Sequence, residues 1–293
     1  MRIIVTGGAG FIGTNLIKEL IKNEHHQVVS IDNYNTGTKL NEQSGCIYYN
    51  ADISEVKAYN EFLEDADLIF HIGARARIQP SFKDPQASFE ANVLGTQNIL
   101  EYARRKNIPV VYAGSSSAHG DLHANPYTFT KWQGEQICNL YYKVFNQRVA
   151  ICRFYNVYGP HQATEGDYCN VLGIFERQWK NNQTLTVTGD GEQRRDFTHV
   201  QDIVQGLIRC GYKLCEDLPA EVSGETFELG RGVNYSINEL VDAFGEMDVE
   251  YLPAYPGEMR ETLNVDTKAQ EILGWKPEHD IIDYIKKTFR RKK

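Results

Sequence analysis

Short apolar runs alternate with segments of helical periodicity through the first half of the chain. Each run is continuous and lies between polar or glycine-containing turns, which is typical of strands buried in a parallel sheet. The five runs cover residues 2–5, 27–31, 68–72, 110–113 and 149–152. This alternation predicts an α/β fold in which helices flank a doubly wound parallel sheet.

One helix between the last two runs is predicted from its start signal. Asn125 is a candidate N-cap, and Pro126 occupies the first helical position. Its expected packing stripe consists of Ile137, Leu140, Tyr141 and Val144.

Beyond about residue 156 the pattern loosens into longer loops. Ser236 and Glu239 have the spacing of a capping box and predict the start of a short helix. A last helix is expected at about 266–273, and the basic run at 286–293 is expected to be a solvated tail.

Composition narrows the class of partners. The formal net charge of −8 argues against a general phosphate-binding surface, so we expect no nucleic acid partner. No apolar run approaches the ~20 residues that span a bilayer, and the chain begins with its first strand, so we expect a cytoplasmic protein with no membrane partner. Six scattered cysteines predict reduced thiols and no metal site, although the spacing of Cys210 and Cys215 leaves a zinc or disulfide role open.

A glycine-rich turn follows the first strand. Gly7, Gly10 and Gly13 lie where this strand gives way to a helix, with Phe11 and Ile12 among them. Glycine lets backbone amides approach a diphosphate closely, and a helix N-terminus favours its negative charge. The motif therefore predicts a dinucleotide-binding site.

Asp32, at the end of the second strand, selects the dinucleotide. Its carboxylate lies where the adenosine ribose hydroxyls need an acceptor, and it would repel the additional phosphate of NADP. We therefore predict NAD as the cofactor. The alternative is that Asp32 only starts a turn with Asn33.

A serine, a tyrosine and a lysine supply the candidate chemistry. Tyr127 and Lys131 are four residues apart, so their side chains leave one face of the predicted helix. Ser115 follows a strand and is expected at the carboxyl edge of the sheet, where open parallel sheets bind ligands. An ammonium group and an oxidised nicotinamide would lower the pKa of the Tyr127 phenol, which could then exchange a proton with a substrate hydroxyl during hydride transfer. The alternative is a surface tyrosine and lysine at a common helical spacing.

Seven stretches of sequence occur in the same order in one enzyme family. They are TGGAGFIG at 6–13, HIGA at 71–74, NVLGT at 92–96, SSS at 115–117, YTFTK at 127–131, RFYNVYGP at 153–160 and GDGEQRRDF at 189–197. From residue 1 to about 277 the chain thus resembles the extended short-chain dehydrogenases/reductases, specifically the nucleotide-sugar epimerase/dehydratase family. The expected organisation is a Rossmann-like NAD-binding domain at 1–155, with part of 196–232 packing back onto it, and a smaller substrate-capping lobe at 156–293.

The resemblance implies cofactor contacts beyond the glycine turn. It places Asp32 and Asn33 at the adenosine ribose, Asp52 and Ile53 at the adenine, Ala74 and Asn92 at the inner ribose, and Phe154 near the nicotinamide.

It also implies contacts to a nucleotide sugar. Asn156 and Arg195 would bind its diphosphate, and the residues expected around the nucleotide are Asn170, Val171, Thr186 and Thr188. The alternative for Arg195 is a local ion pair with Asp190 or Glu192.

The residues after Ser115 help to separate the reactions of this family. Dehydratase relatives carry an Asp-Glu pair there, whereas Ser116 and Ser117 cannot act as acid and base at neutral pH. The triple serine resembles that of UDP-N-acetylhexosamine 4-epimerases. It implies sugar contacts by Ser116 and Ser117 and reversible C4 epimerisation of a UDP-hexose, with UDP-GlcNAc/UDP-GalNAc favoured over UDP-Glc/UDP-Gal. A nucleotide-sugar dehydratase, a 4-keto reductase and a non-catalytic NAD-sensing protein are the alternatives.

Three features depart from the family pattern. The connection at 120–127 is shorter than in relatives and lacks their carboxylate. His119 stands where a tyrosine is usual, and we favour a packing role over an added titratable group. Tyr255 and Glu258 stand in place of an arginine and an aspartate, which makes Arg260 the candidate substitute at the diphosphate.

The resemblance also implies an assembly. Relatives commonly pair through the helix after Tyr127 and a helix at about 86–106, so we expect a homodimer.

Overall fold

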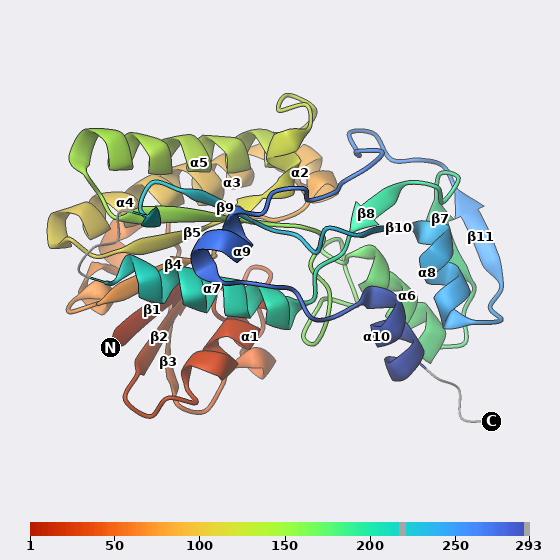
Figure 1. The fold of residues 1–293 in the computed structure, drawn as a ribbon, viewed down its shortest axis with the longest axis horizontal. Helices are drawn as coiled ribbons and strands as arrows, with labels where there is room; N and C mark the ends of the chain where they lie inside the picture. Colours follow the sequence, from red (N-terminus) through yellow and green to blue (C-terminus); the bar gives the residue numbers. More distant parts are fainter. Residues whose placement is uncertain (217–220, 290–293) are drawn as a thin grey trace.

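A computed structural model describes residues 1–216 and 221–289, and a seven-stranded parallel sheet forms the centre of its larger lobe (Figure 1). The strand order is β3-β2-β1-β4-β5-β6-β9. The strands are β1 (Arg2–Thr6), β2 (Gln27–Asp32), β3 (Cys46–Asn50), β4 (Leu68–His71), β5 (Val110–Ser115), β6 (Val149–Phe154) and β9 (Thr226–Leu229). The predicted Rossmann-like, doubly wound α/β fold is confirmed.

The two edge strands lie outside the five predicted runs. In β3 the side chains of the sequence CIYYN are half-exposed or exposed, as expected of a strand at the edge of the sheet. Strand β9 comes from the second half of the chain and pairs with β6, where Phe227 lies beside Cys152. Its apolar run is short, and its pairing joins distant segments, so local periodicity gives little signal for it.

Helices cover both faces of the sheet (Figure 1). On one face lie α1 (Phe11–Leu20), α7 (Val200–Leu214) and α9 (Lys268–Leu273), and on the other α4 (Gly95–Lys106) and α5 (Pro126–Phe145). Leu16 of α1 and Leu207 of α7 are fully buried against the first face, and Ile99 and Leu100 of α4 against the second. This removal of apolar surface from water, at roughly 25 cal/mol per Å², is the main term that stabilises the layers.

Shorter elements connect these layers. They are η1 (Lys39–Asn41), η2 (Val56–Ala58), η3 (Asn60–Leu63), α2 (Ile78–Lys83), α3 (Pro85–Phe89), the π-helical turn η4 (Glu90–Leu94) and η5 (Ser116–His119). None of the helices formed by the described residues is both long and apolar enough to cross a membrane.

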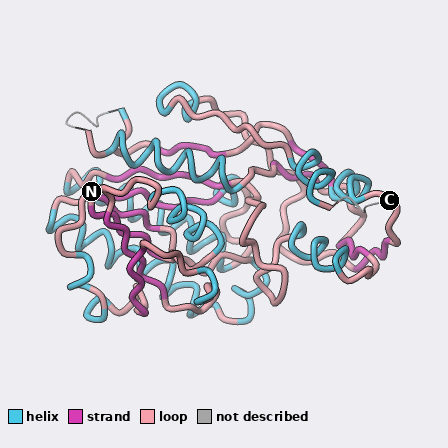
Figure 2. Tube along the Cα trace, turned by 90° about the horizontal axis from the view of Figure 1, so that it is seen from below, coloured by secondary structure: helices cyan, strands magenta, loops and turns pink. Residues whose placement is uncertain are grey.

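A smaller lobe lies beside the carboxyl edge of the sheet (Figures 1 and 2). It contains α6 (Val171–Lys180), β7 (Leu185–Thr188), β8 (Arg194–Asp196), β10 (Asn234–Ser236), α8 (Ile237–Phe244), β11 (Val249–Leu252) and α10 (Ile281–Thr288). Strands β8 and β10 pair antiparallel, and β7 and β11 pair parallel. Phe175, Leu240 and Ile285 belong to a separate apolar core in this lobe.

The predicted helix starts are confirmed, but one packing stripe is partly wrong. Asn125 caps α5 by accepting from the Thr128 amide at 2.8 Å, and Ser236 and Glu239 form the capping box of α8. In the α5 stripe Tyr141 is buried, whereas Leu140 and Val144 are 52% and 61% exposed. Those two positions point away from the sheet.

The C-terminal prediction needs correction as well. The expected helix at 266–273 is α9, and a further helix, α10, follows it. Lys286 and Lys287 lie in α10, whose Ile281 and Ile285 are buried, so the basic run does not start as a solvated tail. In the sequence, the charged residues obscured the short apolar stripe of α10. Residues 290–293 lie outside the described part of the chain.

The six cysteines are free thiols. Cys210 is fully buried against Cys152 in the core beneath α7, whereas Cys215 is half-exposed. The disulfide left open for Cys210 and Cys215 is therefore not formed.

Candidate active site

The glycines of the turn after β1 differ in what surrounds them. Gly7 has a φ of +72°, and a Cβ on it would lie 2.8 Å from the Gly73 Cα atom. A Cβ on Gly13 would lie 2.1 Å from the Gly7 carbonyl oxygen. A Cβ on Gly10 would meet only that oxygen, at 3.3 Å. Gly7 and Gly13 are thus needed by the fold, whereas Gly10 keeps the approach to the N-terminus of α1 open.

This turn fits the diphosphate of a dinucleotide. Gly10 is the N-cap of α1, and Phe11 and Ile12 are its first two residues. The first amides of an α-helix have no partner inside the helix and favour an anion. The cradle beside Gly10 therefore has the shape and the donors that NAD requires.

Asp32 lies beside this cradle at the end of β2. Its carboxylate accepts hydrogen bonds from the amides of Ala9 at 2.9 Å and Tyr34 at 2.7 Å. Burial raises the pKa of Asp32, and the two amides oppose that effect. The residue does start a turn, as the alternative required, and it also ties the turn to the glycine loop.

The predicted adenine contacts gather around Asp52. Asn33 Nδ2 donates to Asp52 Oδ2 at 2.7 Å, and the Ser54 amide donates to Oδ1 at 2.8 Å. Burial raises the pKa of Asp52, but the hydrogen bonds from Ser54 and Asn33 bring it below the ordinary value. Ile53 is buried beside them. Asn33, Asp52 and Ile53 are thus brought together next to the end of β2.

Asn92 holds the loop that follows β4. Its side chain accepts from the Arg75 amide at 2.8 Å and donates to the Arg75 carbonyl at 3.1 Å and to Thr130 Oγ1 at 3.0 Å. It therefore ties the segment after Ala74, which is itself half-buried, to α5. Contact of Ala74 or Asn92 with a ribose stays a prediction.

Three hydroxyl groups meet at the carboxyl end of β5. Tyr127 Oη donates to Ser115 Oγ at 3.1 Å, and Ser117 Oγ lies 2.9 Å from the same oxygen. Ser116 is buried beside them. The structure thus brings together Ser115 and Tyr127, which are separated by the whole 116–126 connection.

Lys131 lies one turn behind Tyr127. Its Nζ donates to the Ala113 carbonyl at 2.5 Å and sits 4.4 Å from the centre of the Tyr112 ring. Burial lowers the pKa of Lys131 to about 8. Among the described residues, no carboxylate is directly paired with this buried ammonium.

The expected lowering of the Tyr127 pKa is not produced by the chain's own groups. Burial raises the pKa of Tyr127, while the hydrogen bond to Ser115 and the positive charge of Arg77 oppose that effect. Desolvation disfavours a phenolate. The short hydrogen bond of Lys131 Nζ goes to the Ala113 carbonyl and not to the Tyr127 hydroxyl. The contribution of an oxidised nicotinamide stays a prediction.

Phe154 and Asn156 lie at the junction of the two lobes. Phe154 ends β6 directly beside Ser115 in the sheet register. Asn156 Nδ2 donates to the Asp196 carbonyl and to Thr262 Oγ1, each at 2.9 Å. Asn156 therefore ties the end of β6 to the smaller lobe.

The residues predicted around the nucleotide lie in the smaller lobe and have local partners. Asn170 caps α6 by accepting from the Gly173 amide at 2.6 Å, and Val171 is the first residue of that helix. Thr186 exchanges hydrogen bonds with Gln178, and the Thr188 carbonyl accepts from Gln193. Their contact with a nucleotide stays a prediction.

The two candidate diphosphate arginines have different environments. Arg195 is 9% exposed, and its Nη2 lies 3.4 Å from Glu258 Oε2. The ion pair of Arg195 with Asp190 or Glu192 is therefore wrong. Arg260 pairs with Asp190 instead, at 2.8 and 3.0 Å, and its side chain is 65% exposed. Arg195 is thus buried with one long ion pair, whereas Arg260 is exposed and held by two hydrogen bonds. Contact of either arginine with a diphosphate stays a prediction.

A chain of charges that the sequence did not reveal lies behind Ser115. Glu135 accepts from Arg153 Nη2 at 2.6 Å and from the Ser115 amide at 3.4 Å. Arg153 Nη1 also pairs with Glu228 at 2.9 Å, and His119 Nε2 lies 3.0 Å from the same Glu228 oxygen. The position of Glu135, four residues after Lys131 on the same helix, was the one available signal.

The packing role favoured for His119 is wrong. Its side chain is 48% exposed, and the hydrogen bond to Glu228 raises the pKa of His119. A titratable histidine thus ends the turn η5, which begins at Ser116.

Comparison with known proteins agrees with this geometry. The family model described as "NAD dependent epimerase/dehydratase family" matches residues 3–216. A putative UDP-glucose 4-epimerase of Methanocaldococcus jannaschii is 33% identical over 98% of this chain and 96% of its own length. A UDP-glucose 4-epimerase of Mycolicibacterium smegmatis is 32% identical over 100% and 99%.

A solved structure is similar over nearly the whole chain. The UDP-glucuronic acid 4-epimerase of Bacillus cereus, in complex with UDP-glucuronic acid and NAD, has a TM-score of 0.88 and 27% identity, covering 99% of this chain and 98% of its own. With the glycine cradle, Asp32 and the Ser115–Tyr127 contact in place, the conclusion is that this chain belongs to the NAD-dependent epimerase/dehydratase family, whose members are extended short-chain dehydrogenases/reductases.

Proposed function

We propose that this chain catalyses reversible, NAD-dependent epimerisation at C4 of a UDP-hexose, with an N-acetylated hexose preferred over a plain one. The observation that carries the proposal is the 3.1 Å contact between Tyr127 Oη and Ser115 Oγ at the carboxyl edge of the sheet. Two hydroxyls in contact can together bind a single sugar oxygen, which is what proton exchange at one carbon needs.

The serines beside that contact favour epimerisation over dehydration. Loss of water across the sugar requires an acid and a base near C5 and C6. Ser116 and Ser117 supply only hydroxyls, and Ser117 Oγ already lies within hydrogen-bond distance of Ser115. We therefore assign Ser116 and Ser117 to sugar binding.

Each catalytic residue has a defined task in this proposal. Tyr127 takes the proton of the C4 hydroxyl and later returns it, and Ser115 hydrogen-bonds the same oxygen. Lys131 supplies positive charge one turn away, and we propose that it favours the phenolate together with the oxidised nicotinamide. NAD, when bound against Gly10 and Asp32, supplies the hydride acceptor.

Epimerisation also requires the sugar to present its other face while the nucleotide remains bound. We assign the diphosphate to Arg195, because its buried guanidinium matches phosphate oxygens. Asn156 and Arg260 are secondary candidates, and Asn170, Val171, Thr186 and Thr188 are proposed to surround the nucleotide.

The direct test is to incubate the purified protein with NAD and UDP-GlcNAc, and in a second incubation with NAD and UDP-Glc. Chromatographic separation of the C4 epimers should show conversion, with the N-acetylated sugar processed faster. Accumulation of a 4-keto product would instead indicate a dehydratase, and net reduction of the added NAD to NADH would indicate a 4-keto reductase working in reverse. Unchanged sugars throughout would contradict the proposal.

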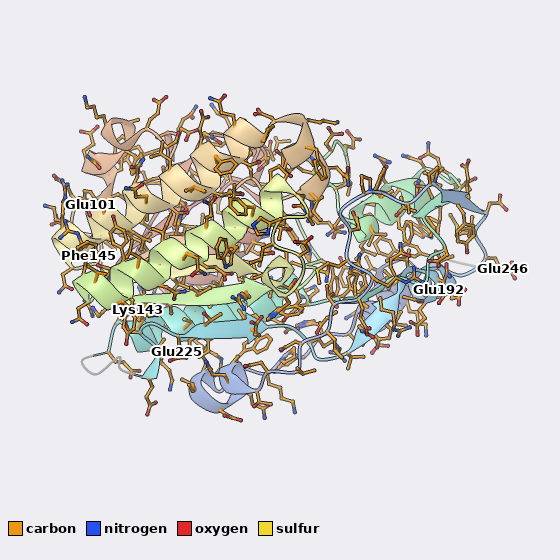
Figure 3. All side chains as sticks on the ribbon, turned by 90° about the horizontal axis from the view of Figure 1, so that it is seen from above. Glu101, Lys143, Phe145, Glu192, Glu225 and Glu246 are labelled. Atoms are coloured by element: carbon orange, nitrogen blue, oxygen red, sulfur yellow. The ribbon has the colours of Figure 1, made fainter. Side chains whose placement is uncertain are left out.

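Three further proposals concern the whole protein. We propose that residues 1–155 and 156–293 form its cofactor and substrate domains, with part of 196–232 in the former, that it is cytoplasmic, and that it forms a homodimer. Exposed apolar side chains along α2 to α5 support the dimer: Phe82, Phe89, Leu94, Leu140, Val144 and Phe145. Figure 3 shows Phe145 at the end of α5, next to α4, which carries Glu101.

A further inference from the structure

A second cation lies close to the catalytic phenol. Arg77 is the N-cap residue of α2, and this helix is joined to the start of α5 by the hydrogen bond from the Tyr127 amide to Ser81 Oγ, at 3.1 Å. Arg77 Nε donates to the Tyr168 carbonyl at 2.9 Å, which fixes the guanidinium. Within residues 1–216 and 221–289, neither Nη atom of Arg77 has a hydrogen-bonded or ion-paired partner.

The charges around this guanidinium do not balance. The ionisable groups that face Arg77 are Tyr127, Cys169 and Glu258. Glu258 is the only carboxylate among them, and its Oε2 already pairs with Arg195. Two guanidinium groups thus share one carboxylate. A half-buried charge without its own partner is costly, so an anionic ligand would stabilise it.

We propose that Arg77 binds a carboxylate carried at C6 of the sugar, which makes a UDP-hexuronic acid the preferred substrate class. The inference rests on the proposed C4 epimerisation, because it uses Tyr127 to locate C4. C6 is attached to C5, the direct neighbour of C4, so a C6 carboxylate lies on the Tyr127 side of the hexose. The two free Nη groups provide the donors for a charge-assisted contact with it. The C2 substituent is not involved, so an N-acetyl group is compatible with this assignment.

The other anion of the substrate is its diphosphate, which is attached at C1. The hexose ring separates C1 from C4, and Arg195 on β8 is already assigned to the diphosphate. Arg77 belongs to the loop after β4 and lies near the phenol that acts at C4. With the diphosphate assigned to Arg195, the sugar carboxylate is the anion left for Arg77.

The test compares kcat/KM for C4 epimerisation of UDP-glucuronic acid and UDP-glucose in three proteins. The wild type should prefer the uronic acid by about 10-fold or more, and Arg77→Met should remove most of that preference, because a charge-assisted bond is lost. Arg75→Met is the matched control, since Arg75 is two residues away and donates to the Tyr168 hydroxyl. It should change the preference by less than about 3-fold. Arg77→Lys keeps the charge and should retain part of the preference, which separates loss of charge from misfolding.

Calorimetry with UDP alone distinguishes the two anions. UDP affinity should be similar in the wild type and Arg77→Met and should fall in Arg195→Met. Equal kcat/KM losses for both sugars, together with weaker UDP binding in Arg77→Met, would overturn the inference and place Arg77 at the diphosphate. A wild type that epimerises UDP-glucose but not UDP-glucuronic acid would overturn the inference and leave C4 epimerisation intact. A wild type that epimerises neither sugar would overturn the inference, and C4 epimerisation would be overturned as well only if UDP-GlcNAc is also left unchanged.

Discussion

Gly10 and Gly13 lie three residues apart in the turn after β1, but they serve different purposes. A Cβ at position 13 would lie 2.1 Å from the Gly7 carbonyl oxygen and 2.7 Å from the Gly8 Cα atom. At position 10 the one close atom would be at 3.3 Å, and the backbone φ of −82° suits any residue. Gly13 therefore serves the fold, and Gly10 serves the ligand.

Substitution by alanine should separate these roles. Gly13→Ala should lower the free energy of unfolding by about 1–3 kcal/mol, as overpacking does, measured by urea denaturation. Gly10→Ala should unfold like the wild type but bind NAD more weakly in a fluorescence titration. Equal stability of both variants, with unchanged NAD affinity in Gly10→Ala, would contradict this assignment.

His119 should make stability depend on pH. Its hydrogen bond with Glu228 raises the pKa of His119 in the folded protein above its ordinary value. A group whose pKa is higher in the folded state than in the unfolded state stabilises the folded protein at pH values below its unfolded pKa. This stabilisation is lost as the pH rises through the pKa of the folded state. Because the side chain is half-exposed, we expect a contribution of less than about 1 kcal/mol.

The measurement is the free energy of unfolding of the wild type and His119→Phe at pH 5.5 and pH 9. The stability advantage of the wild type should be larger at pH 5.5. An advantage that is equal at both pH values, or larger at pH 9, would show that the histidine is not charged in this pair. His123→Phe is a suitable control, because the side chain of His123 is 80% exposed.

The proposed catalytic residues could be selected from the sequence because the signals for them are local. Tyr127 and Lys131 lie on one helix, and Ser115 ends a recognisable strand. Arg153 and Glu228 were missed, because they meet only through the pairing of β6 with β9. The hydrophobic periodicity of a single segment cannot predict an ion pair between two distant strands.

At the scale of elements, α5 connects the fold to the chemistry. Its N-terminus presents Tyr127 to Ser115, and its middle places Glu135 behind the serine turn. The helix could be predicted because Asn125 and Pro126 mark its start. Its exposed positions Leu140 and Val144 could not be distinguished from core positions, since an apolar stripe does not reveal what covers it.

The cap of α5 should contribute measurably to stability. Asn125→Ala removes the acceptor for the Thr128 amide and should lower the free energy of unfolding by about 1 kcal/mol. Asn125→Asp keeps an acceptor and should lose much less. Thermal or urea denaturation of the two variants checks this, and an equal loss in both would mean that the cap is not the source of the effect.

At the scale of the whole molecule, the larger lobe could be predicted and much of the smaller one could not. Repeated apolar runs in the sequence predict the strands of the sheet. The smaller lobe is held by contacts such as Asn156 with Thr262, which join distant segments, and its last helix hides its apolar positions among charges.

The proposed homodimer can be tested on its expected surface. Leu140→Glu places a charge on the exposed face of α5 and should shift the protein towards monomer in analytical ultracentrifugation, because a buried charge without a partner is costly. Leu40→Glu is the control, since Leu40 is 92% exposed on η1. A dimer that persists in Leu140→Glu, or a wild type that is already monomeric, would contradict the assignment.

The central claim is that Tyr127 exchanges a proton at C4 while the C4 hydrogen leaves and returns within one active site. The most direct measurement follows a UDP-hexose labelled with deuterium at C4 by mass spectrometry and NMR, in the wild type and in Tyr127→Phe. The wild type should form the C4 epimer with the deuterium retained, and Tyr127→Phe should be slower by at least about 100-fold. Loss of the label to solvent, or wild-type rates in Tyr127→Phe, would contradict the account.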